Sequence, residues 1–226
     1  MAKSRIIKEL ANGTVTTQVA LKRAKLLLQE FNNDALLEWV NHELMGYTDV
    51  DTIPDYRIKQ GHLRGTYIRG TTSYKNVPLP VGKMPQDLVT TLLSVYFSEG
   101  VEELAQFMEG HKDQPVGKPI PADFYPRIAY YNEDPYMYII SARSEVSVQS
   151  VQGVLTAVES KLLDLFCYLE EQFDVLDELD IDVASKTAEE QKDIVNHISV
   201  LIYNDHRVTM GDNNKIKEST IASSIE

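Results

Sequence analysis

Between Thr17 and Ile58 the sequence passes from two amphipathic helix patterns, through a short polar connection, into a strand pattern. Apolar residues recur at helical spacing within residues 16–31 and again within residues 35–45. The polar residues between the two series leave room only for a tight connection, so we expect the helices to pack as an antiparallel hairpin. This stretch therefore requires a fold that joins a helical hairpin to a sheet.

The rest of the chain alternates between strand and helix patterns. Residues 54–80 predict two or three short strands, and residues 136–148 give the clearest strand pattern. Helical patterns lie near residues 4–10, 87–95, 101–108, 150–173 and 187–203. Five prolines within residues 111–135 exclude one regular element there, so we expect an ordered connection with one helical turn near Phe124.

The order of these patterns predicts an α+β fold, with an N-terminal helical hairpin, a small, mostly antiparallel sheet, long C-terminal helices and an irregular tail. We expect residues 1–204 to form one domain. The polar tail, residues 205–226, is expected to be a separate module that orders only on contact with another subunit or a partner. Its candidate assembly residues are Ile216, Ile221 and Ile225.

Six apolar residues of the longest predicted helix are spaced alternately by four and three positions, as in a coiled coil. They are Val151, Leu155, Val158, Leu162, Leu165 and Leu169. This seam is short, which favours a helix packed in the chain's own core over an intermolecular coiled coil. The single cysteine, Cys167, lies in the same apolar pattern, which excludes a disulfide framework and a thiolate zinc site.

The net charge of −12 is unevenly distributed along the chain. Residues 1–75 hold eleven Lys and Arg against eight Asp and Glu, whereas residues 76–226 hold eleven against twenty-six. Nucleic-acid binding depends on neutralising phosphates, so the net charge disfavours it, and only the N-terminal third suits a polyanion. The sequence has neither a long apolar run nor a secretory signal, so we expect no membrane association and a cytoplasmic location.

The sequence motifs of common catalytic and cofactor sites are absent. GxGxxG, GxxxxGK[ST], GxSxG and HExxH do not occur, and the acidic run at residues 170–182 lacks the glycine and ligand spacing of an EF-hand loop. We therefore expect no catalytic residue, no cofactor and no bound metal, and we interpret the acidic run as a solvated loop.

Cations and tyrosines alternate in the strand region at residues 56–75. Arg64, Arg69 and Lys75 are candidate contacts to a polyanion, because single-stranded nucleic acids bind to aromatic rings interleaved with cations. The same pattern suits a sheet with one solvated face, where the cations only maintain solubility. The second interpretation is favoured.

The segment EWVNHELMGY at residues 38–47, followed by IPDYR at residues 53–57, resembles the AbiTii-type abortive-infection domain. The resemblance is sharp over residues 15–60, and the helix-rich residues 98–180 are compatible with it. It implies a role in bacterial defence against phage, in which infected cells stop growing or die before they release progeny. It implies no particular reaction and carries no catalytic residues.

The polar and aromatic residues of this segment are candidates for either a structural joint or a ligand site. They are Trp39, Asn41, Glu43, Tyr56 and Arg57. The structural interpretation is favoured, with Trp39 as an anchor between the hairpin and the sheet. We expect a non-enzymatic protein that acts as a homo-oligomer or binds a phage or host protein. The alternative is a nucleic-acid-binding or nucleic-acid-processing effector that uses the basic-aromatic face of residues 56–75.

Overall fold

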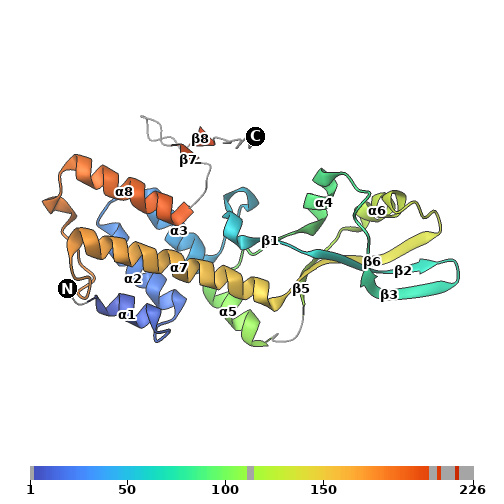
Figure 1. The fold of residues 1–226 in the computed structure, drawn as a ribbon, viewed down its shortest axis with the longest axis horizontal. Coiled ribbons are helices and arrows are strands. Elements are labelled where there is room, and N and C mark those ends of the chain that lie inside the picture. Colours follow the sequence, from blue (N-terminus) through green and yellow to red (C-terminus); the bar gives the residue numbers. More distant parts are fainter. Residues whose placement is uncertain (1–2, 111–114, 204–207, 210–216, 219–226) are drawn as a thin grey trace, which may run out of the picture. The chain divides into compact units, whose positions relative to one another are not determined.

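The computed structural model describes residues 3–110, 115–203, 208–209 and 217–218, and it confirms the predicted α+β class. The chain divides into two compact units (Figure 1). The helical unit comprises Met1–Tyr47, Glu99–Glu102 and Leu155–Glu226, and the sheet unit comprises Thr48–Ser98 and Glu103–Val154. Each unit is described separately below.

The helical unit contains the predicted hairpin. Its helices are α1 (Arg5–Ala11), α2 (Thr17–Gln29), α3 (Asp34–Met45), the larger part of α7 (Val148–Phe173) and α8 (Ala188–Tyr203), with the 3₁₀ turn η4 (Val183–Ser185). The side chain of Thr16 accepts a hydrogen bond from the backbone of Val19 and begins α2. The side chain of Asn33 caps α3 by accepting a hydrogen bond from the backbone of Leu36, and Gly46 ends the helix with a φ of 93° that suits glycine.

The apolar seam of α7 is buried. Leu155 is 8% exposed and the other five seam residues are fully buried. Of the two interpretations that the sequence leaves open, the packed core helix is therefore correct. No seam surface remains for an intermolecular coiled coil.

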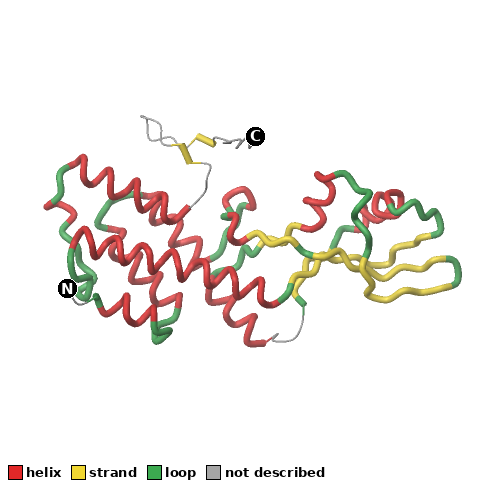
Figure 2. Tube along the Cα trace, viewed as in Figure 1, coloured by secondary structure: helices red, strands yellow, loops and turns green. Residues whose placement is uncertain are grey.

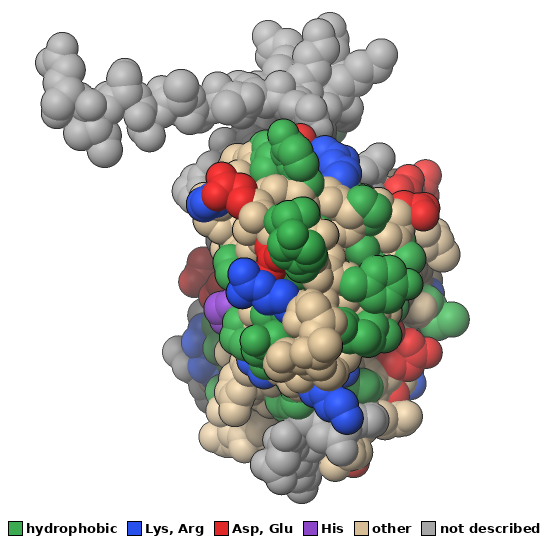
Figure 3. Space-filling model, turned by 90° about the vertical axis from the view of Figure 1, so that its right-hand side faces the viewer, with side chains coloured by type: hydrophobic (Ala, Val, Ile, Leu, Met, Phe, Trp, Pro, Cys, Tyr) green, Lys and Arg blue, Asp and Glu red, His purple; other side chains and the backbone are tan. Residues whose placement is uncertain are grey.

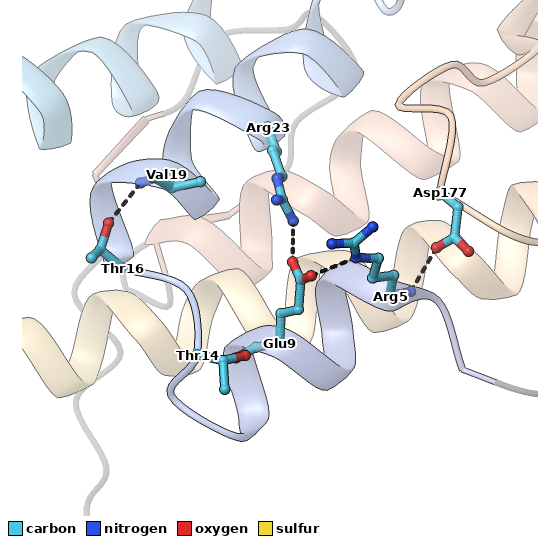
Figure 4. Close-up of polar contacts among 7 residues, drawn as sticks. All are labelled: Arg5, Glu9, Thr14, Thr16, Val19, Arg23 and Asp177. Carbon is cyan, nitrogen blue, oxygen red and sulfur yellow. Dashed lines mark hydrogen bonds and ion pairs between the residues drawn. The ribbon is translucent and has the colours of Figure 1, made fainter.

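A carboxylate joins α1 to α2 (Figure 4). Glu9 accepts hydrogen bonds from Arg23 Nη1 at 2.7 Å and from Arg5 Nε at 2.5 Å, and these contacts lower its pKa. The backbone nitrogen of Arg5 donates to Asp177 at 2.6 Å. The start of α1 is thus connected to the segment that follows α7, which is far from it in the sequence.

Glu170, near the end of α7, holds the first residues of the chain. Its carboxylate accepts hydrogen bonds from both the backbone nitrogen and the hydroxyl of Ser4, and it pairs with Lys3 at 2.8 Å. The side chain of Ser4 makes no capping hydrogen bond to α1; its hydroxyl donates to Glu170 and accepts from the backbone of Leu176. The acidic run beginning at residue 170 is therefore partly structural, not only a solvated loop.

The sheet unit is built on four antiparallel strands in the order β3-β2-β6-β5. Figure 2 shows the strands of the chain in yellow. These strands are β2 (His62–Arg69), β3 (Thr72–Pro78), β5 (Val116–Pro119) and β6 (Met137–Val146). A separate two-stranded sheet pairs β1 (Ile58–Gln60) with β4 (Ser94–Tyr96). The unit also contains the turns η1 (Val50–Thr52), η2 (Asp55–Arg57) and η3 (Ala122–Phe124), the helices α4 (Gln86–Leu93) and α6 (Tyr125–Tyr131), and most of α5 (Val101–Gly110).

Helices α4 and α6 cover one face of the four-stranded sheet, which we call the inner face. The core between them contains Leu63, Leu88, Leu92, Ile128 and Ile139. Residues paired across two antiparallel strands point to the same side, so the register of β2 and β6 also defines the opposite face. This outer face carries the pairs Arg64–Arg143, Thr66–Ser141 and Ile68–Tyr138.

Residues 111–135 hold more regular structure than their prolines suggest. Besides the expected turn near Phe124, this segment contributes strand β5 and a seven-residue helix, α6. Pro119 ends an edge strand and Pro126 lies in the first turn of α6, where a missing N–H costs no internal hydrogen bond.

The helix expected over residues 87–95 ends at Leu93, because the next three residues pair with β1.

Within the described residues of the tail, two short strands pair with each other. β7 (Val208–Thr209) and β8 (Lys217–Glu218) are antiparallel, with Val208 opposite Glu218. Ile216, Ile221 and Ile225 lie outside the described residues, so their role in assembly stays a prediction. Among the helices described, none combines the length and apolar character that crossing a bilayer requires.

Candidate functional site

We call the candidates Trp39, Asn41, Glu43, Tyr56 and Arg57 the signature residues, and three of these five lie on α3 of the helical unit. Trp39 is 1% exposed and Glu43 is fully buried one turn later, on the same side of the helix. The hydroxyl of Tyr47 donates to Glu43 at 2.6 Å. Asn41 points elsewhere and accepts a hydrogen bond from Lys25 of α2 at 2.8 Å. Asn41 therefore connects the two helices of the hairpin, while Trp39 and Glu43 are part of its buried side.

The other two signature residues, Tyr56 and Arg57, lie in η2 of the sheet unit. Arg57 is fully buried, and its guanidinium donates to the carbonyl of Phe97 at 2.8 Å. The backbone of Phe97 donates in turn to the carbonyl of Arg57 at 3.0 Å. These reciprocal bonds fasten η2 to the chain just after β4, whereas the side chain of Tyr56 is half-buried.

The candidate polyanion contacts do not share one face of the sheet. Arg64 lies on the outer face, whereas Arg69 is paired with Met137 on the inner side and forms an ion pair with Asp134 at 2.8 Å. Lys75 is exposed on the edge strand β3, at an irregularity in its pairing with β2. The alternation of residues along β2 thus separates cations that are close in sequence.

A second arginine, which the sequence reasoning missed, lies opposite Arg64. Arg143 of β6 is its cross-strand partner, and its Nε donates to Glu145 at 2.5 Å. The Nε of Arg64 lies 3.5 Å from the same carboxylate. A hollow of about 290 Å³ opens between the two arginines, and we call it the arginine groove. In the sequence, Arg143 could have been noticed as the one Lys or Arg within the strand pattern of residues 136–148.

A larger hollow of about 640 Å³ lies beside the inner face, where α6 leads into β6. Its apolar lining comprises Pro126, Ala129, Tyr130, Tyr131, Pro135 and Met137, and we call it the tyrosine pocket. Lys83 and Glu133 form an ion pair in its lining. Figure 3 views this end of the sheet unit and shows hydrophobic side chains at the surface beside charged ones.

Cys167 is half-buried on α7, and burial raises the pKa of its thiol. The thiol is therefore neutral at pH 7, which is the wrong state for a nucleophile. Within the part of the chain that the structure describes, no group of three or more His, Cys, Asp or Glu side chains has the arrangement of a metal site.

The comparison with known protein families matches residues 4–196 to the family described as AbiTii. The match covers both units, from the start of α1 into α8. No curated protein and no solved structure matches the chain.

Proposed function

Because the chain belongs to the AbiTii family, an abortive-infection domain of phage defence, we propose that it acts by self-association through the tyrosine pocket rather than by catalysis. The single observation that carries this proposal is the shape and chemistry of that pocket. Apolar and aromatic side chains line a hollow at the surface, where a monomer gains nothing from exposing them.

The pocket lies beside side chains that protrude. Tyr130 is 75% exposed and Tyr136 is 76% exposed, although both are large and largely apolar. A surface with a projection next to a hollow can complement itself across a two-fold axis, since each copy supplies both parts. Tyrosine is also among the residues that contribute most binding energy at the centre of protein interfaces.

The charge distribution favours the sheet unit for contact between copies. The sheet unit holds ten Lys and Arg against eleven Asp and Glu, whereas the helical unit holds twelve against twenty-three. Two helical units would repel each other through their net charges of −11, but two sheet units with net charges of −1 would not. Lys83 and Glu133, at the pocket, offer one charge of each sign to a second copy.

The test replaces Tyr136 by serine in the full chain. Under the proposal, light scattering gives a mass above the 25.6 kDa of one chain for the wild type and a lower mass for Tyr136→Ser, and protection against phage is lost. Tyr138→Ser is the matched control for the oligomeric mass alone, because Tyr138 is 71% exposed on the outer face. A wild-type monomer, or a Tyr136→Ser variant with unchanged mass and protection, would contradict the proposal.

The tail offers a competing location for assembly, through the predicted residues Ile216, Ile221 and Ile225. A chain that ends at Tyr203 separates the two possibilities, since it keeps the tyrosine pocket intact. We expect this shortened chain to retain the wild-type oligomeric mass. A monomer would instead assign assembly to the tail.

A further inference from the structure

We propose that the outer face of the β3-β2-β6-β5 sheet binds single-stranded nucleic acid, with a phosphate in the arginine groove and a base on Tyr138. The proposal is independent of the tyrosine pocket, which lies beside the inner face. It rests on four properties of the outer face: uncompensated charge, polar lining, an exposed ring and the distance between charge and ring.

The arginine groove holds two positive charges and one negative charge. Arg64 and Arg143 face each other across β2 and β6, and like charges at directly opposed positions destabilise a sheet. Glu145, whose side chain is 10% exposed, contacts both guanidinium groups and compensates one of the two charges. One positive charge remains, so a single monoanionic group, such as a phosphodiester, would neutralise the site.

The groove presents donors to such a group. In the described part of the chain the side chain of Arg143 makes one hydrogen bond, from Nε to Glu145, which leaves the two terminal nitrogens of its guanidinium available. Arg64 is held in place by Asn76 as well as by Glu145. Thr66 also lines the groove, and its hydroxyl accepts a hydrogen bond from the Asn76 backbone, so its proton can be donated outward.

An exposed apolar strip continues from the groove along the same face. Tyr138 is 71% exposed, and Ile68, which is 36% exposed, lies directly opposite it. A tyrosine ring on an open sheet surface is a stacking platform for an unpaired base, whatever the identity of that base. The aromatic and cationic parts of a single-strand site are thus combined on one surface.

The spacing favours a strand over a single nucleotide. Four residues along β2 separate the pair at Arg64 from the pair at Ile68, which corresponds to about 13 Å at 3.3 Å per residue. At a stacked rise of 3.4 Å this distance covers about four nucleotide steps. One mononucleotide therefore cannot occupy both parts of the face, whereas a short oligonucleotide can.

The net charge of the whole chain weakens this interaction but does not exclude it. The excess of carboxylates lies mainly in the helical unit, while the sheet unit is close to neutral. With few phosphates neutralised, the dissociation constant should fall at about 10⁻⁶ to 10⁻⁴ M, typical of non-specific binding, and affinity should decrease as salt is raised.

The test measures fluorescence anisotropy of a labelled twelve-nucleotide single strand, as DNA and as RNA, with the full-length chain at low salt. We expect Arg143→Ala to weaken binding at least fivefold, and Tyr138→Ala to weaken it about five- to hundredfold, as base stacking on an aromatic ring requires. Arg127→Ala is the matched control, because it removes an exposed cation from α6 on the other side of the sheet. Unlabelled adenosine monophosphate should compete far less effectively than the unlabelled strand.

Several results would overturn the proposal. They are the absence of measurable binding to either strand, an equal loss for Arg127→Ala and Arg143→Ala, or equal competition by the mononucleotide. If Tyr138→Ala leaves oligonucleotide binding unchanged but lowers the oligomeric mass, the outer face serves protein contacts instead. Circular dichroism of each variant verifies the fold, and Arg143→Gln, which removes the charge but keeps a polar side chain, replaces Arg143→Ala should that variant unfold.

Discussion

Protonation of Glu170 should destabilise the helical unit in a defined range of pH. Burial alone raises the pKa of this carboxyl, but the hydrogen bonds from Lys3 and Ser4 outweigh burial and lower the pKa from 4.5 to about 2. The folded state therefore binds the proton less tightly than the unfolded state. The resulting stabilisation is fully present above pH 4.5 and is lost as the pH falls from 4.5 to about 2.

The magnitude follows from the difference between the two pKa values. At 1.36 kcal/mol per pH unit, the lowering of the Glu170 pKa corresponds to at most about 3 kcal/mol. The Lys3 side chain is 51% exposed, so solvent screens its contribution, and we expect about 1–2 kcal/mol. Replacing Glu170 by glutamine should lower the free energy of unfolding by this amount at pH 7.

The assay is urea denaturation of the wild type and of Glu170→Gln, followed by circular dichroism at pH 7, 5, 4 and 3.5. The stability difference should be constant down to pH 5 and should shrink below it. Glu171→Gln is the matched control, since it makes the same charge change at an exposed position of the same helix. A difference between wild type and Glu170→Gln that stays the same at pH 7 and pH 3.5 would falsify the electrostatic argument.

Three further substitutions test the fold. Gly65→Ala should be strongly destabilising, because a Cβ there would lie 2.7 Å from the Ser141 carbonyl oxygen. A thermal midpoint within about 2 °C of the wild-type value would contradict this close approach. Trp39→Ala should cost about 3–5 kcal/mol in denaturant titrations, and a cost below about 1 kcal/mol would show that Trp39 is no core anchor. Thr187→Ala breaks the reciprocal capping box with Glu190 and should cost about 0.5–2 kcal/mol, so an unchanged free energy of unfolding would exclude that role.

Local sequence patterns predict most of the helices and the longer strands of this fold. The capping box at Thr187 and Glu190, the α7 seam and the alternation in residues 62–69 are each contained within one element, so a short window suffices. Strands β4 and β5 were missed because three or four residues carry little periodicity of their own. Their strand conformation depends on partners elsewhere in the chain, as with Ile58 opposite Tyr96.

The candidate surfaces were predictable only in part, because they depend on pairing between distant elements. Arg64 was singled out from its own strand, but its partner Arg143 follows from the register of β2 with β6, which no local pattern contains. Arg57 was a candidate through the family resemblance alone, because its spacing does not distinguish it from a surface cation, and yet it is fully buried against the Phe97 carbonyl. Burial of a cation depends on tertiary packing, so composition and spacing do not reveal it.

The helical unit is discontinuous in sequence, and this determines when it can be completed on the ribosome. Helices α1 to α3 emerge first, but the α7 segment that packs with them begins at Leu155, after the sheet unit has been synthesised. At 5–20 residues per second, the roughly 100 residues in between take about 5–20 s to translate. During this time the apolar sides of α2 and α3 lack their α7 partner. The nascent chain therefore passes through a period of exposure to chaperones and proteases that ends only when Glu170 reaches Ser4.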